Sequence, residues 1–383
     1  MQIEPTARNT AIAVIRKAME AAYRGDEARL GECYARDAVA VSPAFGEVRG
    51  RANIIAMWGK LFSTFPDMAV EVSDTLVDGD RVAVLGSVKA TDRVGWFGLP
   101  ATGGPISYRL VLLFTIADGL ITHDERIYDS TGVIERLEKA HLDKEMKTAA
   151  DVQRALLART AHVGPFFESV GHSVPCRAIG GDFFDFVELP SGDIGIALGD
   201  VAGKGPAAAL LAAMLQGMLM AEAPAGDGPA AALARMNRRM AAQRFESRFA
   251  TLVYGVLSPN GRLTYSSAGH NPPVLVSGGR LRRLTSGGPL LGAFGHAAFE
   301  EETIHLADAD TLVMFTDGVT EARNAADEEF GDDRLLACVT TAGDAPPAVV
   351  LGRIFEDVQT FCQRTDQTDD ITVMVTRFCA AAR

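Results

Sequence analysis

The hydrophobic pattern of the first third of the chain changes from a helical period to a strand period. Ile12, Ile15, Met19 and Ala22 lie three or four positions apart, which predicts a helix over residues 6–24. Further helices are predicted over 26–34 and 52–65, with a short strand over 38–42 between them. Four longer strands follow, and Asp-Gly turns join them in pairs: 68–76 with 81–90, and 106–116 with 120–128. Helices followed by a curved antiparallel sheet predict an α+β unit over residues 1–133.

A helical segment of different character is predicted over residues 134–160. This stretch contains no Gly or Pro and is rich in strong helix formers. Its apolar residues form one narrow stripe among charges: Leu142, Met146, Ala149, Val152 and Leu156. The pattern predicts a helical linker. The stripe fits a contact between two copies of the chain, a lever that passes on a signal, or simple packing on the next domain.

In residues 161–383, apolar strands repeatedly begin or end at an aspartate. Strands are predicted over 183–188 and 194–198, with a turn over 190–193 between them, and a helix that is apolar almost all round follows over 206–223. A second hairpin and two later strands complete the pattern: 249–258 with 262–270, then 311–316 and a strand that starts at 369. The aspartates at the strand ends are Asp182, Asp200, Asp317, Asp369 and Asp370.

These aspartates indicate a site for divalent cations. Antiparallel neighbours return alongside each other, so the first hairpin would bring Asp182 close to Asp200. Carboxylates gathered without a run of Lys or Arg repel one another, and oxygen ligands without clustered Cys or His favour Mg²⁺ or Mn²⁺ over zinc. Two such ions can activate a water molecule and bind phosphoryl oxygens. The strand ends therefore predict a two-metal centre.

Composition narrows the classes of partner and the compartment. The net charge of the 383 residues is −12 and no basic stripe offsets it, which argues against nucleic-acid binding. The five cysteines are scattered and form no CxxC pair, so reduced thiols are expected. The N-terminus lacks the pattern of a signal peptide, and no uninterrupted apolar run reaches membrane-spanning length. We expect a cytoplasmic protein that binds no membrane.

Seven phrases in the second half occur in a known order: GGDFFD, GDVAGKG, FATLVYG, AGHNPP, GGPLLGAF, TDGVTEA and DDITVMV. They resemble the metal-dependent protein phosphatases of type 2C, most closely the bacterial branch with stage II sporulation protein E and the stress-response sigma-factor regulators. The resemblance covers about residues 151–378. It implies that residues 161–383 form an αββα sandwich, in which two antiparallel sheets are flanked by helices and the metal site lies at one sheet edge.

The resemblance also implies roles for individual residues. Asp200 would bridge two Mn²⁺ or Mg²⁺ ions, and the main-chain carbonyl of Val201 would complete one site. Asp317 and Asp369 would bind the other ion, and Asp182 would contribute directly or through water. In this scheme Asp200, Asp317 and Asp369 are the catalytic residues, because they hold the ions that activate a hydroxide for attack on phosphoserine or phosphothreonine.

Five further residues have weaker assignments. Asp370 adjoins the ligands and would support them from behind. Arg177 is a candidate phosphate ligand, although turn arginines are common. Ala202 stands where eukaryotic members of the family have a histidine, so the leaving group must take its proton from water or from elsewhere. His270 is expected to close a turn and not to act in catalysis, and Lys204 is interpreted as a solvated loop charge.

The first 133 residues resemble another family. The phrases GRANIIAMW, GLPATGGPISYRLVLLFTIADGLITHDERIYD and STGVIERL are similar to the SnoaL-like polyketide-cyclase branch of the nuclear transport factor 2-like superfamily. The resemblance implies a cone with an apolar pocket. Cyclase-like members use a His/Asp pair, for which His123, Asp124 and Asp129 are the candidates here. Ligand binding or dimerisation is the favoured role, and Trp58, Trp96 and Phe97 would line the pocket or form its core.

The expected function is dephosphorylation of a regulatory phosphoprotein. The resemblance implies an anti-sigma-factor antagonist of the STAS type as substrate, with regulation through a small molecule or a homodimer contact of the N-terminal domain. One alternative is an inactive sensor or scaffold with a phosphatase fold. A haloacid-dehalogenase-type phosphatase is another, but the sequence after Asp317 lacks the second aspartate of its DxD motif.

Overall fold

The computed structural model describes residues 5–156, 160–243, 249–363 and 365–380. The chain divides into two compact units, Met1–Glu145 and Met146–Arg383. Helix α4 (Ser130–Leu156) begins in the first unit and ends in the second. It corresponds to the predicted linker helix, whose residues 157–159 lie outside the described part of the chain.

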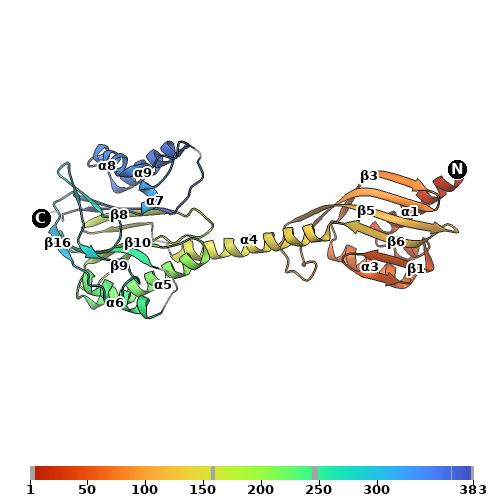
Figure 1. The fold of residues 1–383 in the computed structure, drawn as a ribbon, viewed down its shortest axis with the longest axis horizontal. Helices are drawn as coiled ribbons and strands as arrows, with labels where there is room; N and C mark the ends of the chain where they lie inside the picture. Colours follow the sequence, from red (N-terminus) through yellow and green to blue (C-terminus); the bar gives the residue numbers. More distant parts are fainter. Residues whose placement is uncertain (1–4, 157–159, 244–248, 364, 381–383) are drawn as a thin grey trace. The chain divides into compact units, whose positions relative to one another are not determined.

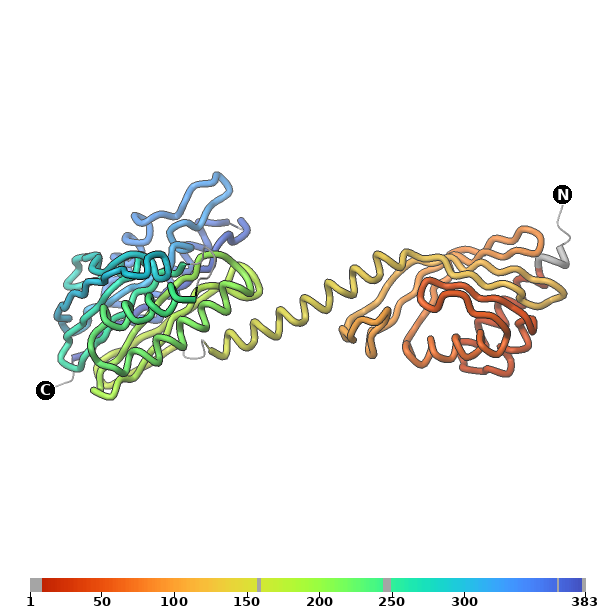
Figure 2. The backbone as a smooth tube through the Cα atoms, turned by 60° about the horizontal axis from the view of Figure 1, so that its bottom comes forward, coloured from red at the N-terminus to blue at the C-terminus, as the bar shows by residue number. Residues whose placement is uncertain are grey.

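The N-terminal unit is an α+β fold in which helices cover one face of a six-stranded sheet (Figures 1 and 2). The strand order is β2-β1-β6-β5-β4-β3. Buried side chains such as Ile54, Val82 and Phe114 fill the space between helices and sheet. The elements are α1 (Pro5–Tyr23), α2 (Glu27–Gly31), β1 (Tyr34–Ser42), β2 (Gly46–Arg49), α3 (Arg51–Thr64), β3 (Ala69–Asp78), β4 (Arg81–Thr91), β5 (Pro105–Ala117) and β6 (Leu120–Tyr128).

Two expectations for this unit are wrong. The helix predicted through Tyr34 ends at Gly31, and Tyr34 instead opens β1, where its buried hydroxyl donates to Asp124 at 2.8 Å. The sheet is not antiparallel throughout, because β1 pairs with β6 in parallel. The parallel pair arises because α3 carries the chain to the opposite edge of the sheet, at β3, and three antiparallel steps then return it to β1.

The second unit contains two facing sheets. One has the order β15-β12-β11-β10-β9, with β16 beside β12, and the other has the order β14-β13-β17-β18-β8-β7. The pairs are antiparallel except for the two-residue β15, which lies parallel to β12. The strands are β7 (Ala161–Gly164), β8 (Phe167–Val174), β9 (Phe183–Glu188), β10 (Ile194–Val201), β11 (Ala250–Leu257), β12 (Arg262–Ala268), β13 (Val274–Ser277), β14 (Arg280–Arg283), β15 (Gly287–Gly288), β16 (Glu302–His305), β17 (Thr311–Phe315) and β18 (Ile371–Phe378).

Three apolar layers hold this unit together. Along β10, alternate side chains point to opposite faces, so Ile196 and Leu198 pack between the sheets while Ala197 packs toward helices α5 (Pro206–Glu222) and α6 (Pro229–Ala242). The other sheet packs its outer face on α8 (Gly331–Ala342) and α9 (Pro347–Cys362). Figure 1 shows the helices on the two outer faces. The arrangement confirms the predicted αββα sandwich.

Helix α5, although apolar almost all round, lies on the outside of one sheet and is only partly buried. Leu211, Leu215 and Leu219 are buried against the sheet, whereas Leu210 is 73% exposed and Met220 56% exposed. The stretch Pro206–Ala225 is long and apolar enough to cross a membrane by length and composition alone, and half of its apolar window is buried inside this unit.

Candidate metal centre

The five aspartates at the predicted strand ends come together where the two sheets of the second unit meet. Asp182 precedes β9, and Asp200 is the penultimate residue of β10 in the same sheet. Asp317 opens the short helix α7 (Asp317–Thr320) after β17, and Asp369 and Asp370 precede β18. The Asp200 side chain hydrogen-bonds to Asp182, and the charges of the other three aspartates act on it. Four segments distant in the sequence thus supply one acidic cluster.

Two threonine hydroxyl groups from the opposite sheet hold the buried carboxylate of Asp182. Thr316 Oγ1 donates to Asp182 Oδ2 at 2.9 Å, and Thr372 Oγ1 donates to the same oxygen at 2.6 Å. Both threonines are fully buried, and they also pair with each other through the Thr372 N–H and Thr316 Oγ1. These bonds connect β9 of one sheet to β17 and β18 of the other, and they fix Asp182 at the junction.

Asp370 uses both of its oxygens to hold main-chain groups. Its Oδ1 accepts from the N–H of Cys176 at 2.8 Å, and its Oδ2 accepts from the N–H of Gly181 at 2.6 Å. The side chain is buried. Asp370 therefore ties the segment before Asp182 to the segment before β18, and this geometry fits a supporting role better than a ligand role.

The pKa values of three aspartates are raised in this cluster. Burial, and then the charge of Asp317, raises the pKa of Asp200 to about 7. Burial and the neighbouring Asp200 raise the pKa of Asp182 well above its usual range, and burial and Asp369 raise the pKa of Asp317. The charged forms are disfavoured because like charges are gathered away from water. Divalent cations among these oxygens would offset that repulsion, so the donor set fits Mg²⁺ or Mn²⁺.

Lys204 lies exposed in a loop, as interpreted, but its ammonium group is also paired with the acidic cluster. Its Nζ lies 3.0 Å from Asp369 Oδ2 and also donates to the main-chain oxygen of Thr368. The loop that leads from β10 into α5 folds over the segment before β18, and this brings the ammonium group to the acidic cluster. Lys204 thus contributes a positive charge at the edge of the centre.

The loops around Asp200 approach the cluster closely. A Cβ atom on Gly181 would lie only 2.7 Å from the main-chain oxygen of Val201, so glycine is required there. Val201 itself is buried at the end of β10, next to the half-buried Ala202. Arg177 is exposed, and its guanidinium group lies beside Gly205 at the start of α5. It stays a candidate for contact with a phosphate group.

His270 is a buried residue of the sheet core. Its Nδ1 shares a hydrogen bond of 2.6 Å with Thr251 Oγ1 on β11, and its N–H donates to Ser267 Oγ at 3.1 Å. Burial lowers the pKa of His270 to about 4. The ring is therefore neutral at physiological pH and closes the turn after β12, which fits a structural role.

The buried His270 should make stability depend on pH. The unfolded chain binds a proton to this histidine below about pH 6.5 and the folded chain only below about pH 4, so the contribution of His270 to the unfolding free energy should fall by about 2 kcal/mol between pH 7 and pH 5. The raised pKa values of the aspartates act in the opposite direction in wild type and variant alike, so denaturant titrations should show the wild type losing about 2 kcal/mol relative to His270→Asn. The exposed His296 provides the control, because His296→Asn should keep the wild-type dependence. Parallel pH curves for wild type and His270→Asn would contradict the prediction.

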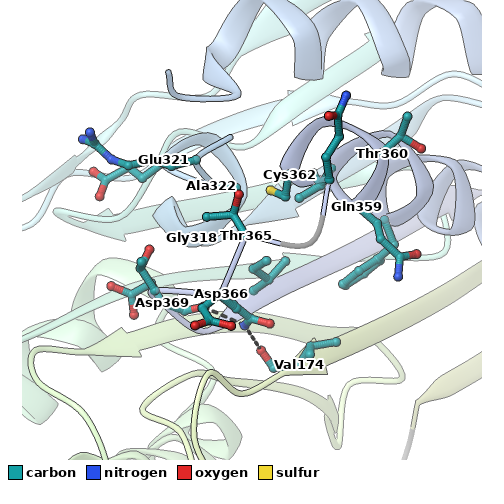
Figure 3. Close-up of a pocket in the computed structure, with 17 residues that line it drawn as sticks. Val174, Gly318, Glu321, Ala322, Gln359, Thr360, Cys362, Thr365, Asp366 and Asp369 are labelled. Atoms are coloured by element: carbon teal, nitrogen blue, oxygen red, sulfur yellow. Dashed lines mark hydrogen bonds between the residues drawn. The ribbon is translucent and has the colours of Figure 1, made fainter. Parts of the chain in front are cut away.

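A cavity of about 570 Å³ adjoins the acidic cluster (Figure 3). Gly318 and Asp369 line it on the side of the cluster, and Phe355 and Val358 of α9 give it an apolar wall. Glu321 and Asp366 place carboxylates at the same cavity. The side-chain amide of Gln367 fixes the adjoining loop, since it donates to the main-chain oxygens of Val174 and Asp369 at 2.7 Å each. Of the five clustered aspartates, Asp369 is the one that lines the cavity, so the cavity reaches the edge of the cluster.

The candidate His/Asp pair of the N-terminal unit is not assembled. His123 and Asp124 are consecutive on β6, so their side chains point to opposite faces of the sheet. His123 faces Glu125 at 3.9 Å near the surface, whereas Asp124 is buried and binds Tyr34 and Arg126. Asp129 caps the start of α4 by accepting from the N–H of Gly132. Trp58 lies in the buried core, and Trp96 and Phe97 pack on it half-buried.

Sequence reasoning missed three residues of the metal centre. Thr316 and Thr372, the partners of Asp182, stand beside the aspartates in the phrases TDG and DDIT, and this position was the available signal. Cys176 carries its sulfur within 4.8 Å of ligand atoms of Asp369 and Asp370. Burial, followed by a hydrogen bond to Asp370, raises the pKa of the Cys176 thiol to about 11, so it is protonated at neutral pH and leaves the oxygen donors as the ligand set.

The αββα sandwich with acidic strand ends at the sheet junction defines the class of metal-dependent, PP2C-type phosphatase folds. Residues 190–379 match the family model of stage II sporulation protein E (SpoIIE), and residues 15–124 match the SnoaL-like domain. The chain therefore carries a SpoIIE-type phosphatase domain preceded by a SnoaL-like domain.

Two relatives and one solved structure are similar to this chain. Phosphoserine phosphatase RsbU of Bacillus subtilis is 31% identical over 48% of this chain and 55% of its own length. Protein IcfG of Synechocystis is 30% identical over 52% of this chain and 36% of its own length. The chain thus spans about a third to about half of these relatives. The structure of the SiaA-PP2C domain of Pseudomonas aeruginosa shares the fold, with a TM-score of 0.56 and 19% identity over 63% of this chain and 98% of that domain.

Proposed function

We propose that this protein is a metal-dependent phosphatase that removes phosphate from serine or threonine residues of a regulatory protein. The observation that carries the proposal is the acidic cluster, in which the pKa values of Asp182, Asp200 and Asp317 are all raised by burial and by like charge. Such a cluster fits divalent cations. The similarity of the second unit to Phosphoserine phosphatase RsbU supports the reaction class.

In the proposed site, Asp200 and the main-chain carbonyl of Val201 would help to hold the divalent cations. Asp317 and Asp369 would supply further carboxylate ligands, and Asp182 would contribute directly or through a water molecule. When bound, Mn²⁺ or Mg²⁺ supplies Lewis acidity that lowers the pKa of a water molecule and neutralises phosphoryl charge. Thr316 and Thr372 keep the Asp182 carboxylate in one orientation. Lys204 brings positive charge to Asp369, and the exposed Arg177 beside Gly205 is proposed to contact a phosphate oxygen.

Metal removal should abolish the activity. We expect the full chain to hydrolyse an aryl phosphate and a phosphoserine protein with Mn²⁺ or Mg²⁺, and to lose at least about 10²-fold in rate with excess chelator, because the carboxylates alone cannot activate water at neutral pH. Phosphate release before chelation, after chelation and after readdition of each metal measures this effect. Activity that survives thorough chelation would contradict the proposed mechanism.

The proposed substrate is a phosphorylated anti-sigma-factor antagonist of the STAS type. A folded protein presents its phosphorylated side chain with neighbouring residues, and the cavity beside Asp369 offers room for them. The name of the relative RsbU supports a phosphoserine substrate. Loss of the phosphate mass from a purified phospho-STAS protein, measured against free phosphoserine, tests the proposal. Equal rates for both would contradict recognition of the protein.

The N-terminal unit is proposed to regulate the phosphatase by binding a small molecule or by forming a homodimer. Inside this unit, Asp124 Oδ1 and Arg126 Nε are buried without a hydrogen-bond partner among the described residues. These atoms suit a small ligand that carries both a donor and an acceptor. Ligand-induced thermal shifts in the wild type that disappear in Asp124→Asn would support binding, and sedimentation velocity tests the dimer. An unshifted, monomeric protein would contradict both forms of regulation.

The alternative is an inactive sensor or scaffold with a phosphatase fold. Such a protein would keep the αββα sandwich but would have no active metal centre. The gathered carboxylates and the threonines that orient Asp182 favour the enzyme over this alternative, since a scaffold gains no stability from buried like charges. Absence of phosphate release from every phosphoprotein and aryl phosphate tested with both metals would favour the scaffold.

A further inference from the structure

Thr251 of β11 lies directly beside Asp200 of β10. The two strands are antiparallel, and Asp200 is the cross-strand partner of Thr251. Side chains of such partners lie on the same face of the sheet, with Cβ atoms about 4.5–5.5 Å apart. Leu198 and Val253 form the next pair on this face and are buried between the two sheets. A hydroxyl group therefore stands next to a carboxylate that is a proposed cation ligand.

His270 holds the hydroxyl group of Thr251. Nδ1 of the buried ring and Thr251 Oγ1 share a hydrogen bond of 2.6 Å. The main-chain N–H of His270 donates to Oγ of Ser267, which is also buried, so the ring is anchored in the sheet core. Threonine is β-branched and has few side-chain rotamers. The bond to an anchored ring therefore gives the Thr251 hydroxyl group a defined direction.

The protonation of the His270 ring decides which of the two groups donates. Nε2 makes no hydrogen bond of ordinary geometry among the described residues, but the main-chain oxygen of Phe315 acts on the ring as an acceptor. Since Nδ1 is bonded to Thr251, this oxygen favours the neutral tautomer with its proton on Nε2. With that assignment Nδ1 is an acceptor and Thr251 donates to it. The remaining lone pairs of the Thr251 oxygen are then available to the acidic cluster.

This arrangement places two acceptors side by side. The carboxylate of Asp200 and the oxygen of Thr251 both offer lone pairs, and both side chains are half-buried. Neighbouring acceptors repel each other unless a cation or a hydrogen-bond donor lies between them. A hard divalent cation would bind the carboxylate, and Mg²⁺ usually keeps several water molecules, whose protons would suit the hydroxyl oxygen.

We propose that Thr251 is a positioning residue of the metal centre, whose oxygen accepts a hydrogen bond from a water molecule held beside Asp200. His270 sets the direction of this acceptor from the sheet core, in addition to closing the turn after β12. This inference rests on the proposed metal centre. Thr251 touches neither cation nor substrate, and its effect passes through the water molecule that it orients.

The test compares variants of the full chain. Thr251→Val keeps the shape of the side chain and removes the hydroxyl group, whereas Thr251→Ser keeps the hydroxyl group and removes the methyl group. Thr264→Val makes the same change farther along the sheet, where Thr264 bonds to Thr303 at 2.9 Å, and serves as the control. Thermal unfolding with excess chelator shows whether each variant is folded. Thr251→Ala takes the place of Thr251→Val if the valine variant is not.

The affinity for Mn²⁺ is a readout that does not depend on catalysis. By calorimetry on metal-free protein, Thr251→Val should bind Mn²⁺ about 10-fold more weakly than wild type, as expected for a group that supports a metal site from outside. Thr251→Ser should recover most of this loss, and Thr264→Val should match wild type. At saturating Mn²⁺, Thr251→Val should lower kcat for an aryl phosphate and leave KM unchanged, because Thr251 does not contact the substrate.

The outcomes separate this inference from the proposed function. Wild-type Mn²⁺ affinity in Thr251→Val would overturn the positioning role. Equal losses in Thr251→Val and Thr251→Ser would overturn it too, because the effect would then come from packing and not from the hydroxyl group. Affinities in the expected order support the role even if the wild type hydrolyses no phosphate ester, and in that case the phosphatase proposal fails alone.

Discussion

Replacing Asp200 by Asn is expected to reduce Mn²⁺-dependent phosphate release at least about 10²-fold. Changes to residues that merely support metal ligands already cost about 10- to 100-fold, so loss of a carboxylate that is itself a proposed metal ligand should cost at least as much. The same change should stabilise the chelated protein, because the raised pKa of Asp200, about 7, shows that its charge is disfavoured among its neighbours. Phosphate release and thermal unfolding with excess chelator measure the two effects on the same samples.

The matched control is Asp333→Asn, at an exposed position in the first turn of α8. It removes one carboxylate elsewhere on the same unit and should leave both measurements unchanged. Full activity in Asp200→Asn would exclude Asp200 as the bridging ligand. A fall in activity together with a fall in the stability of the chelated variant would indicate damage to the fold instead of loss of a metal ligand.

A second large effect is expected from Gly318→Ala, which adds one methyl group directly after Asp317. That methyl group would overlap the main-chain oxygen of Asp370 and lie 3.5 Å from Cβ of Asp369. The start of α7 must then move away from the segment before β18, which separates Asp317 from Asp369. A displacement of about 1 Å at a reacting centre can cost about 10²-fold in rate, and overpacking should cost about 1–3 kcal/mol of stability. Steady-state phosphate release and denaturant unfolding check both numbers.

Gly352→Ala provides the comparison, since it makes the same chemical change inside α9 where a Cβ atom meets open space. Alanine is a better helix former than glycine, so this variant should be about 1 kcal/mol more stable and fully active. If Gly318→Ala retained wild-type activity, the close approach of α7 to the segment before β18 would have no bearing on catalysis.

Local patterns predicted most of the elements of both units. Strand β9 begins and ends where the apolar residues before the turn at 190–193 placed it, and β6 does so after the Asp118-Gly119 turn. Predicted and observed strand ends are expected to agree where the apolar pattern and the turn residues lie close together in the sequence. The clustering of the aspartates was also predictable, because strand ends in facing sheets lie at a common edge and carboxylates without cationic neighbours suggest a metal.

Contacts between distant segments could not be predicted in the same way. The pairing of β1 with β6 in parallel depends on where α3 delivers the chain, which no local period encodes. The bond of Lys204 to Asp369 requires the loop after β10 to fold over a segment far along the sequence. Likewise, the sequence shows Thr316 and Thr372 beside the aspartates, but their hydrogen bonds to Asp182 depend on how the second sheet packs on the first.

The distribution of the acidic cluster over four distant segments has a consequence for synthesis on the ribosome. Asp182 and Asp200 emerge early in the phosphatase unit, whereas Asp369 and Asp370 precede β18, the last strand described. The cluster is complete only when β18 has paired with β17 and β8. The pairing of β18 with β8 joins segments that are far apart in the sequence, so it carries a large entropic cost of loop closure. Until then, a nascent chain carries only part of the acidic cluster and has no complete metal site. Phosphatase activity should therefore arise only after β18 has paired with β17 and β8.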